Sequence, residues 1–336
     1  MSYINTVLTA VKGDVRLNQI ETLEKKPVLI RFRNAIMKHL PSYLGLLPFF
    51  ALLIVFVIVP IITGILRSFT DWSMSSRDEI NFVALENYKY LLAGEGTTSK
   101  RFLKSLVNMA IYVPITVVVG IGISLILALI VTQLNDKLYR FYRSVYYIPT
   151  VIPVFLCVAI WQWFMTTDTG IVSSLLAKIG IGEGVTWAET AGYALAEVII
   201  VDVWNMIGFN FLIILAGMKD ISPELYEAAD IDGASTLQKM KNITIPLLEP
   251  VLFFVITYAF ICAIQVYDIP WILSGYDDMN AVGGPDQVML FPVMEMVRNV
   301  YNGSASGLGR ACAMGVMLML IIMAITAIQF KGRKKN

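Results

Sequence analysis

Long apolar stretches separated by polar segments dominate the chain. A helix needs about 20 mostly apolar residues to cross a bilayer, and six stretches reach that length. They are Gly45–Leu66, Leu106–Val131, Ser144–Met165, Ala191–Gly217, Val251–Leu273 and Leu308–Phe330. The pattern predicts an all-α, polytopic membrane protein with six transmembrane helices.

Several of these stretches contain prolines, among them Pro60, Pro114, Pro149 and Pro153. Proline lacks the backbone N–H and clashes with the preceding turn, so each is expected to kink its helix. Kinks are tolerated in a membrane where a neighbouring helix or a cavity satisfies the freed carbonyl groups. We therefore expect some spans to be irregular.

The polar segments divide the chain into three parts. Residues 1–44 form a mixed-charge N-terminal arm, residues 45–330 the membrane domain, and residues 331–336 a short basic tail. Within the membrane domain, the loop at 67–105 is expected to be a small folded cap. The loop at 166–184 should hold one short helix bounded by glycines, and Gly-Gly-Pro at 283–285 must interrupt any helix in the third loop.

The positive charges indicate the orientation of the chain. Cytoplasmic loops of membrane proteins are enriched in lysine and arginine. Most of the 26 such residues lie in the arm, in the polar segments after the second and fourth stretches, and in the tail. This distribution predicts that both termini are cytoplasmic.

Composition disfavours several other classes of protein. The chain is 57% hydrophobic and 15% charged, with a net charge of +1, and it has no basic aromatic patch that would indicate nucleic-acid binding. It contains no Gly-Lys pair, so it cannot build a P-loop for nucleotide phosphates. The only histidine is His39, and Cys157, Cys262 and Cys312 lie in or beside apolar runs, where packing is their expected role. We expect no catalytic residues and no metal site.

The most polar internal segment, residues 226–250, lies between the fourth and fifth stretches and follows a helix-start signal. Ser222 is placed to cap a helix and Pro223 suits its first position. Glu224 and Glu227 lie where the helix dipole favours negative charge. Gly233 lies where either a left-handed residue at the end of this helix or a close backbone approach is expected.

A second short helix is expected directly afterwards. Ser235 and Gln238 have the spacing of a capping box, and Leu237 and Met240 would share one face of the helix. The segment is thus predicted to be a compact helix–turn–helix that presents Leu237 and Met240 to a cytoplasmic partner. The alternative is an ordinary structured loop.

The spacing within this segment resembles the EAA loop of ABC importer permeases. The family pattern is Glu-Ala-Ala, three residues, Gly, nine residues, then Ile-x-Leu-Pro. The chain has Glu227-Ala228-Ala229, then Gly233 and Ile243-x-x-Pro246 at the same spacing, with Ile245 in place of the leucine. Stretches such as "YRSVYYIPTVIPVFLCVAIWQWFM" and "GGPDQ" extend the resemblance over roughly residues 42–330. They are similar to the carbohydrate branch, and there to the maltose-type first permease subunit.

The resemblance implies a permease subunit of a binding-protein-dependent ABC importer for a carbohydrate, with a type I importer architecture, in the cell membrane of a prokaryote. Its implied partners are cytoplasmic ATP-binding subunits, a second permease that is a related but different chain, an extracellular or periplasmic solute-binding protein, and membrane lipid. ATP and Mg would be used by the ATPase subunit, and this chain would bind no cofactor. The implied coupling loop, residues 219–247, uses Glu227, Ala228, Ala229, Asp232, Gly233, Leu237, Met240, Ile243 and Pro246. The family usually has aromatic residues where this chain has Leu237 and Met240.

Two other interpretations stay open. A secondary transporter working alone could use the ionisable residues Glu197 and Asp202 of the fourth stretch. An ABC permease could instead carry a non-sugar solute such as glycerol phosphate. A membrane enzyme is disfavoured because the chain has no catalytic constellation.

Polar side chains within the fourth and fifth stretches are the candidates for a substrate path. Asp202, Asn205 and Phe209 lie on one stripe of a helix, and Cys262 and Gln265 share a face close to Tyr267. A charge at the centre of a span costs about 2.5–3.5 kcal/mol, so Asp202 should face a cavity or a partner. Amides and carboxylates beside an aromatic ring suit a sugar. Alternatively, these groups only join helices to one another.

Overall fold

The computed structural model describes residues 43–74, 80–167, 169–275, 281–301 and 306–333. The regular elements of these residues are helices, apart from one isolated bridge between Thr70 and Phe82. Nearly all of the predicted N-terminal arm, with His39, and the last three residues of the tail lie outside the described ranges. The chain divides into two units, residues 1–63 and 64–336.

The described part of the first unit is a helix that begins at Tyr43. It contains one π-helical turn, η1 (Ile54–Ile58), and continues as α3 (Val59–Arg67). The candidate span Tyr43–Arg67 matches the predicted stretch Gly45–Leu66 to within two residues at each end. Its apolar side chains are mostly exposed, as expected of a helix that has lipid as its solvent.

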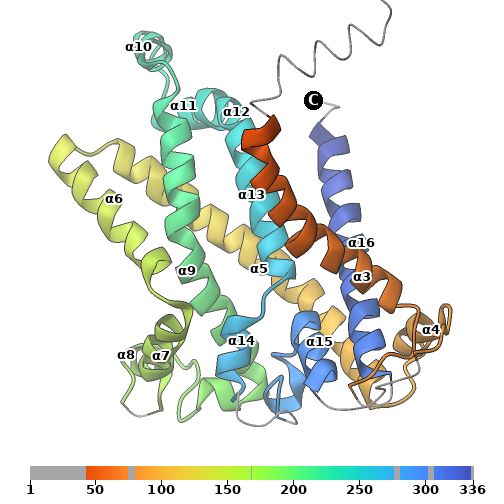
Figure 1. Ribbon diagram of the computed structural model, residues 1–336. Helices are drawn as coiled ribbons and strands as arrows, with labels where there is room; N and C mark the ends of the chain where they lie inside the picture. Colours follow the sequence, from red (N-terminus) through yellow and green to blue (C-terminus); the bar gives the residue numbers. More distant parts are fainter. Residues whose placement is uncertain (1–42, 75–79, 168, 276–280, 302–305, 334–336) are drawn as a thin grey trace, which may run out of the picture. The chain divides into compact units, whose positions relative to one another are not determined.

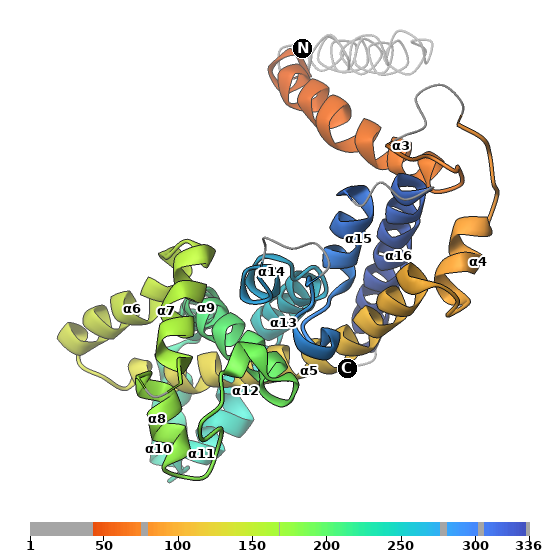
Figure 2. The same ribbon diagram turned by 90° about the horizontal axis from the view of Figure 1, so that it is seen from below.

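The second unit is built around two long helices, α5 (Thr97–Thr132) and α9 (Ala191–Lys219), which pack along each other. The helix α6 (Asp136–Val151) packs against α9, and α13 (Glu249–Ile264) packs against α5. The last helix, α16 (Gly307–Arg333), packs against α15 (Pro292–Tyr301), as Figure 2 shows. The core of the central pair is formed by Tyr112, Val113, Val117, Val198, Phe211 and Ile214.

Several helices extend beyond the predicted spans. The helix α5 begins at Thr97, nine residues before the predicted start, because the polar turn at its N-terminus is buried against the loops of this end. The helix α16 continues to Arg333, so residues 331–333 of the predicted tail are helical. In the part of the chain that the structure describes, five helices are long and apolar enough to cross a membrane, and a broken pair could provide a sixth span.

The broken pair is the third predicted stretch, which is not one straight helix. α6 and α7 (Val154–Met165) are bent by 100° at Ile152–Pro153. Pro153 has no N–H to donate to the carbonyl of Pro149, four residues earlier. That carbonyl instead accepts from Asn205 Nδ2 of α9 at 3.2 Å and lies 3.8 Å from Cys157 Sγ. The kink expected from these prolines is confirmed.

The fifth predicted stretch is also interrupted. α13 ends at Ile264, Gln265–Tyr267 are not helical, and α14 (Asp268–Leu273) follows. Two of the three non-helical residues, Gln265 and Tyr267, are predicted members of the substrate path.

Close contact between α6 and α9 depends on Gly208. A Cβ at this position would lie 2.8 Å from the Tyr146 carbonyl and would collide with Thr150 Oγ1. Thr150 Oγ1 in turn donates to the Asn205 carbonyl at 3.0 Å. Glycine therefore allows the two backbones to approach, as small residues commonly do between membrane helices.

Short helices gather at the two ends of the second unit (Figure 1). α10 (Pro223–Ile231), α11 (Thr236–Lys239) and α12 (Ile245–Leu247) lie at one end. At the opposite end lie α4 (Glu86–Leu92), α8 (Ile171–Ala177), α14 and α15. The short helix expected in the second loop is α8, and it begins directly after Gly170.

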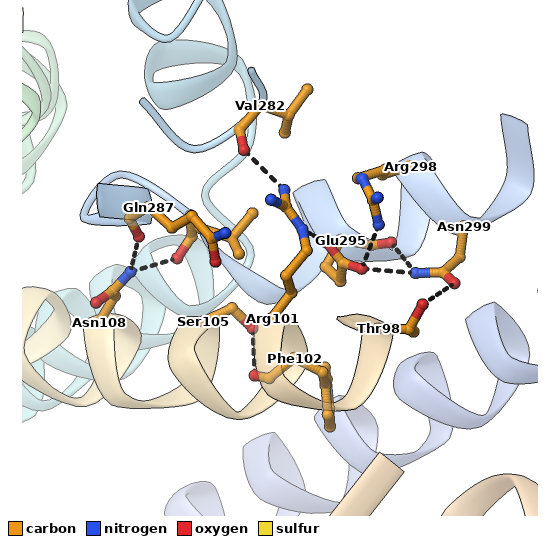
Figure 3. Close-up of polar contacts among 11 residues, drawn as sticks. Thr98, Arg101, Phe102, Ser105, Asn108, Val282, Gln287, Glu295, Arg298 and Asn299 are labelled. Carbon is orange, nitrogen blue, oxygen red and sulfur yellow. Dashed lines mark hydrogen bonds and ion pairs between the residues drawn. The ribbon is translucent and has the colours of Figure 1, made fainter. Parts of the chain in front are cut away.

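A network of buried charges holds the end that carries α15 (Figure 3). Glu295 of α15 is fully buried and accepts from Arg101 Nε of α5 at 2.8 Å and from Arg298 Nη1 at 3.0 Å. Asn299 Nδ2 donates to the same carboxylate at 2.9 Å. Arg101 Nη2 also donates to the Val282 carbonyl at 2.7 Å, which ties the third loop to α5.

A neighbouring side chain fixes the turn that follows the Gly-Gly-Pro sequence. Asn108 Nδ2 donates to the carbonyls of Gln287 and Leu290 at 2.7 and 2.9 Å. Gly283, Gly284, Asp286 and Gln287 all have positive φ, so this segment cannot continue as a helix. The predicted interruption is confirmed.

The network predicts that Glu295→Gln is severely destabilising. The change leaves two buried arginines without a counter-charge, a situation that costs about 3–5 kcal/mol. Glu249→Gln is the matched control, because Glu249 and Arg333 form an exposed pair at 3.2 Å and such pairs contribute at most about 1 kcal/mol. Unfolding of the purified full-length chain in detergent measures both. Equal losses at the two positions would contradict a structural role for the network.

Candidate functional site

The polar segment at 219–247, which we call the coupling loop, folds as predicted in most respects. Pro223 occupies the first position of α10, although the side chain of Ser222 makes no capping hydrogen bond, so that part of the prediction is wrong. The helix ends at Ile231, and Gly233 has φ +72°. This left-handed residue reverses the chain, with Ala234 N donating to the Ala229 carbonyl at 2.9 Å.

The second half of the coupling loop is attached to the first by side chains. α11 begins with the predicted capping box, in which Ser235 N donates to Gln238 Oε1 at 2.7 Å and Gln238 N to Ser235 Oγ at 3.4 Å. Lys239 Nζ contacts Asp230 Oδ1 at 2.6 Å. These contacts make α10 and α11 one braced unit.

The base of the coupling loop is anchored to the membrane helices. The Tyr226 and Thr244 hydroxyls are 3.0 Å apart and join α10 to the π-helical turn η3 (Met240–Thr244). Ile243 is half-buried and packs against the main core. Met240 is also half-buried and lines a cavity of about 420 Å³ behind the loop, together with Leu129, Met218 and Tyr226.

The coupling loop exposes three large apolar side chains. The exposed fractions of Ile231, Leu237 and Leu225 are 89%, 68% and 45%. Leu237 therefore faces outward as predicted, whereas Met240 does not share that face because it turns toward the cavity. The sequence pattern did not indicate Ile231 and Leu225, because it is defined mainly by charged and glycine positions. Of the remaining predicted members, Glu227, Ala228, Asp232 and Pro246 are exposed, and Ala229 is half-buried.

A second candidate site is a cavity of about 220 Å³ between α9 and the break that follows α13. We call it the break cavity. Its lining includes five of the six predicted substrate-path residues, brought together from α9, from α13 and from the break after α13: Asp202, Asn205, Cys262, Gln265 and Tyr267. The sixth, Phe209, is not in the lining, and its ring packs against that of Tyr258 at 5.0 Å.

Hydrogen bonds fix the polar groups on the α9 side of the break cavity. The carboxylate of Asp202 accepts a hydrogen bond from the buried Tyr112 hydroxyl of α5. Asn205 Nδ2 donates a hydrogen bond to the Pro149 carbonyl. Asn205 therefore connects α9 to α6 and also lines the cavity. Tyr112 had no signal in the sequence, because a single tyrosine in an apolar run is common in a core.

On the other side of the break cavity, the side chains are less constrained. Cys262 and Gln265 are exposed, and the Tyr267 ring lies 5.1 Å from that of Trp271. Asp268 adds a second carboxylate, and no lysine, arginine or histidine is among the described residues that line the cavity. The arrangement offers carboxylate, amide and aromatic groups, which can bind hydroxyl groups and stack on an apolar face.

Comparisons with known proteins agree with this geometry. Residues 120–330 match the family described as binding-protein-dependent transport system inner membrane component. The arabinooligosaccharides transport system permease protein AraP of Halalkalibacterium halodurans is 29% identical over 95% of each chain. The sn-glycerol-3-phosphate transport system permease protein UgpA of Yersinia pseudotuberculosis is 28% identical over 86% of this chain and 92% of its own.

A solved structure has the same fold. It is that of a bacterial ABC transporter involved in the import of the acidic polysaccharide alginate, and it superposes with a TM-score of 0.73 at 18% identity. The match covers 91% of this chain and 99% of the other. Since the identity is low, this likeness establishes the helical architecture and leaves the choice of solute to the residues of the site.

The geometry of the break cavity predicts a difference in reactivity between two native cysteines. Cys262 lines the cavity and is exposed, whereas Cys157 is fully buried between α6, α7 and α9. A charged, water-soluble thiol reagent should therefore modify Cys262 and leave Cys157 unmodified over the same period. Mass spectrometry of the labelled full-length chain measures this, with Cys262→Ser as the control. Modification of Cys157 in preference to Cys262 would show that water does not enter at the break.

Proposed function

The chain belongs to the family of binding-protein-dependent transport system inner membrane components, and from that premise we propose that it forms the path by which a neutral carbohydrate enters the cell. It is the membrane subunit of an ABC importer, and ATP is used by a partner subunit.

The chemistry of the break cavity carries the choice of substrate. Its described lining has two carboxylates, Asp202 and Asp268, and no cationic side chain. A phosphate or another anion would meet like charge there, whereas sugar hydroxyls can donate to carboxylates and to the Gln265 side-chain carbonyl. The cavity therefore favours a neutral sugar or oligosaccharide over glycerol phosphate. A second permease, a related but different chain, would complete the path.

The coupling loop is the proposed contact with the ATPase. Its apolar outer face, Ile231 and Leu237, would enter a cleft of the cytoplasmic ATP-binding subunit, and Glu227 would face the same partner. The Lys239–Asp230 contact lets the loop move as one piece. Its anchors at Ile243 and Tyr226 connect that movement to the membrane helices.

The fold supports cytoplasmic placement of the C-terminus together with the coupling loop. Arg333, near the end of α16, pairs with Glu249, which begins α13 directly after the loop. The two segments therefore lie at the same end of the helices (Figure 1). The opposite end, with α8, α14 and α15, would face the extracellular or periplasmic solute-binding protein.

Glu197 is buried within α9 and has a carboxylate oxygen without a hydrogen-bond partner in the described structure, a feature that would also suit a stand-alone secondary transporter. Membership of the permease family assigns the chain to an ABC importer instead. The two functions differ in their energy source. Uptake in vesicles that requires ATP and an added binding protein is therefore the expected result, and uptake that needs only a proton or sodium gradient would contradict it.

We predict that Gly233→Val uncouples the transporter. Valine at positive φ costs about 1–3 kcal/mol and should distort the turn between α10 and α11, so that less ATPase is retained and substrate-stimulated ATP hydrolysis falls. Gly275→Val is the matched control. Gly275 has φ +80° and free space around it, but it follows α14 at the opposite end of the fold. Co-purification of the ATPase with each variant is the measurement, and equal retention by the two would refute the assignment.

We also predict that Gln265→Ala and Asp202→Asn lower sugar uptake while binding-protein-stimulated ATP hydrolysis continues. Each loses a hydrogen bond to substrate, which contributes about 0.5–1.5 kcal/mol, or more for the charged group. Gln162→Ala on α7 is the control, because Gln162 is exposed and lies outside the cavity lining. Normal uptake by both cavity variants would place the substrate contacts on the second permease.

A further inference from the structure

A cavity of about 250 Å³ lies between α6 and α9, separate from the coupling-loop cavity and the break cavity. Tyr139 and Arg143 of α6 form one wall. Lys219 and Asp220, at the end of α9, form the other polar wall, and Leu212, Leu215 and Ala216 form the apolar floor. The cavity thus joins polar groups at its mouth to apolar groups deeper along the helices.

The positive groups of this cavity lack acidic partners. Among the described residues, no carboxylate lies within ion-pair distance of Arg143 or Lys219. Lys219 Nζ instead lies 4.3 Å from the centre of the Tyr139 ring, which holds the ammonium group at the mouth. Asp220 offsets one of the two charges, and Arg140, one turn before Arg143, adds another cation on α6.

The surroundings of the cavity are those of a membrane boundary. Lys219 is the last residue of the candidate span α9. α6 exposes apolar side chains along the length that follows the cations, with Ile148 and Val151 exposed by 52% and 66%. α6 starts at the end of the fold that carries the coupling loop (Figure 1). The mouth therefore faces headgroups while the exposed apolar residues face acyl chains.

We propose that this cavity binds the phosphate of an anionic phospholipid in the leaflet on the coupling-loop side. Basic pockets between membrane helices suit lipid phosphates, and each lysine or arginine near an anionic surface contributes about 1 kcal/mol. Arg143 and Lys219 bind the phosphate. The acyl chains extend along the exposed part of α6 that carries Ile148 and Val151. The site does not depend on the direction of transport or on the identity of the solute.

The test measures lipid retained by the full-length chain, purified in its transporter complex, by native mass spectrometry. Phosphatidylglycerol and phosphatidylcholine with identical acyl chains are the probes, and inorganic phosphate in large excess is a separate competitor. The wild type should retain phosphatidylglycerol over phosphatidylcholine. Arg143→Gln with Lys219→Gln should reduce its affinity by about tenfold or more.

Two further double variants are controls for misfolding and for a non-specific effect of positive charge on lipid binding. Arg143→Lys with Lys219→Arg keeps the charges and should retain the lipid. Lys100→Gln with Lys104→Gln removes two exposed lysines at the opposite end of the fold and should also leave retention unchanged. Equal retention of the two lipids, or unchanged retention by the double glutamine variant, would overturn the proposal. Displacement of the lipid by inorganic phosphate would do so as well, because it would identify a simple ion site.

Discussion

The absence of water from the bilayer core is the constraint on which this fold depends, because every backbone polar group there must find a partner within the protein. Where Pro153 interrupts the third span, the freed Pro149 carbonyl is bound by Asn205 of the neighbouring helix. Gly208 brings the two backbones close enough for that contact. At the other interruption, Gln265–Tyr267, the irregular backbone borders the break cavity. Irregular structure within a membrane is tolerated where it lines a cavity, and this cavity is where we propose that the solute passes.

The two ends of the second unit have different mechanical properties. At one end, the buried Glu295 and its arginine partners fix α15 and the third loop to α5. At the other, the coupling loop is braced internally but has a cavity behind it and an exposed apolar face. The proposed function uses this difference: the loop would transmit a displacement to the membrane helices, and the opposite end would offer the binding protein a firm surface.

Much of this architecture could be predicted from the sequence, because span length, capping boxes and left-handed glycines are local. The capping box at Ser235 and the left-handed Gly233 are examples. Hydropathy measures how far an apolar run extends but not its direction, so the 100° bend within residues 144–165 could not be read from it. Contacts between residues far apart in the sequence, such as that of Tyr112 with Asp202, could not be predicted either. The same holds for the orientation of side chains in the coupling loop, where Met240 is half-buried and Ile231 is exposed. The five residues of the break cavity were found because polar groups in a span are costly and therefore informative.

The central claim is that energy from ATP enters this chain through the exposed apolar face of the coupling loop. Site-specific photo-cross-linking from position 237 in the assembled transporter tests it most directly. The same probe at position 179, an isoleucine that is 70% exposed at the opposite end of the fold, serves as the control. The account predicts a cross-link from position 237 to the ATP-binding subunit and none from position 179. A transporter active in ATP hydrolysis whose position 237 forms no cross-link to that subunit would contradict the account.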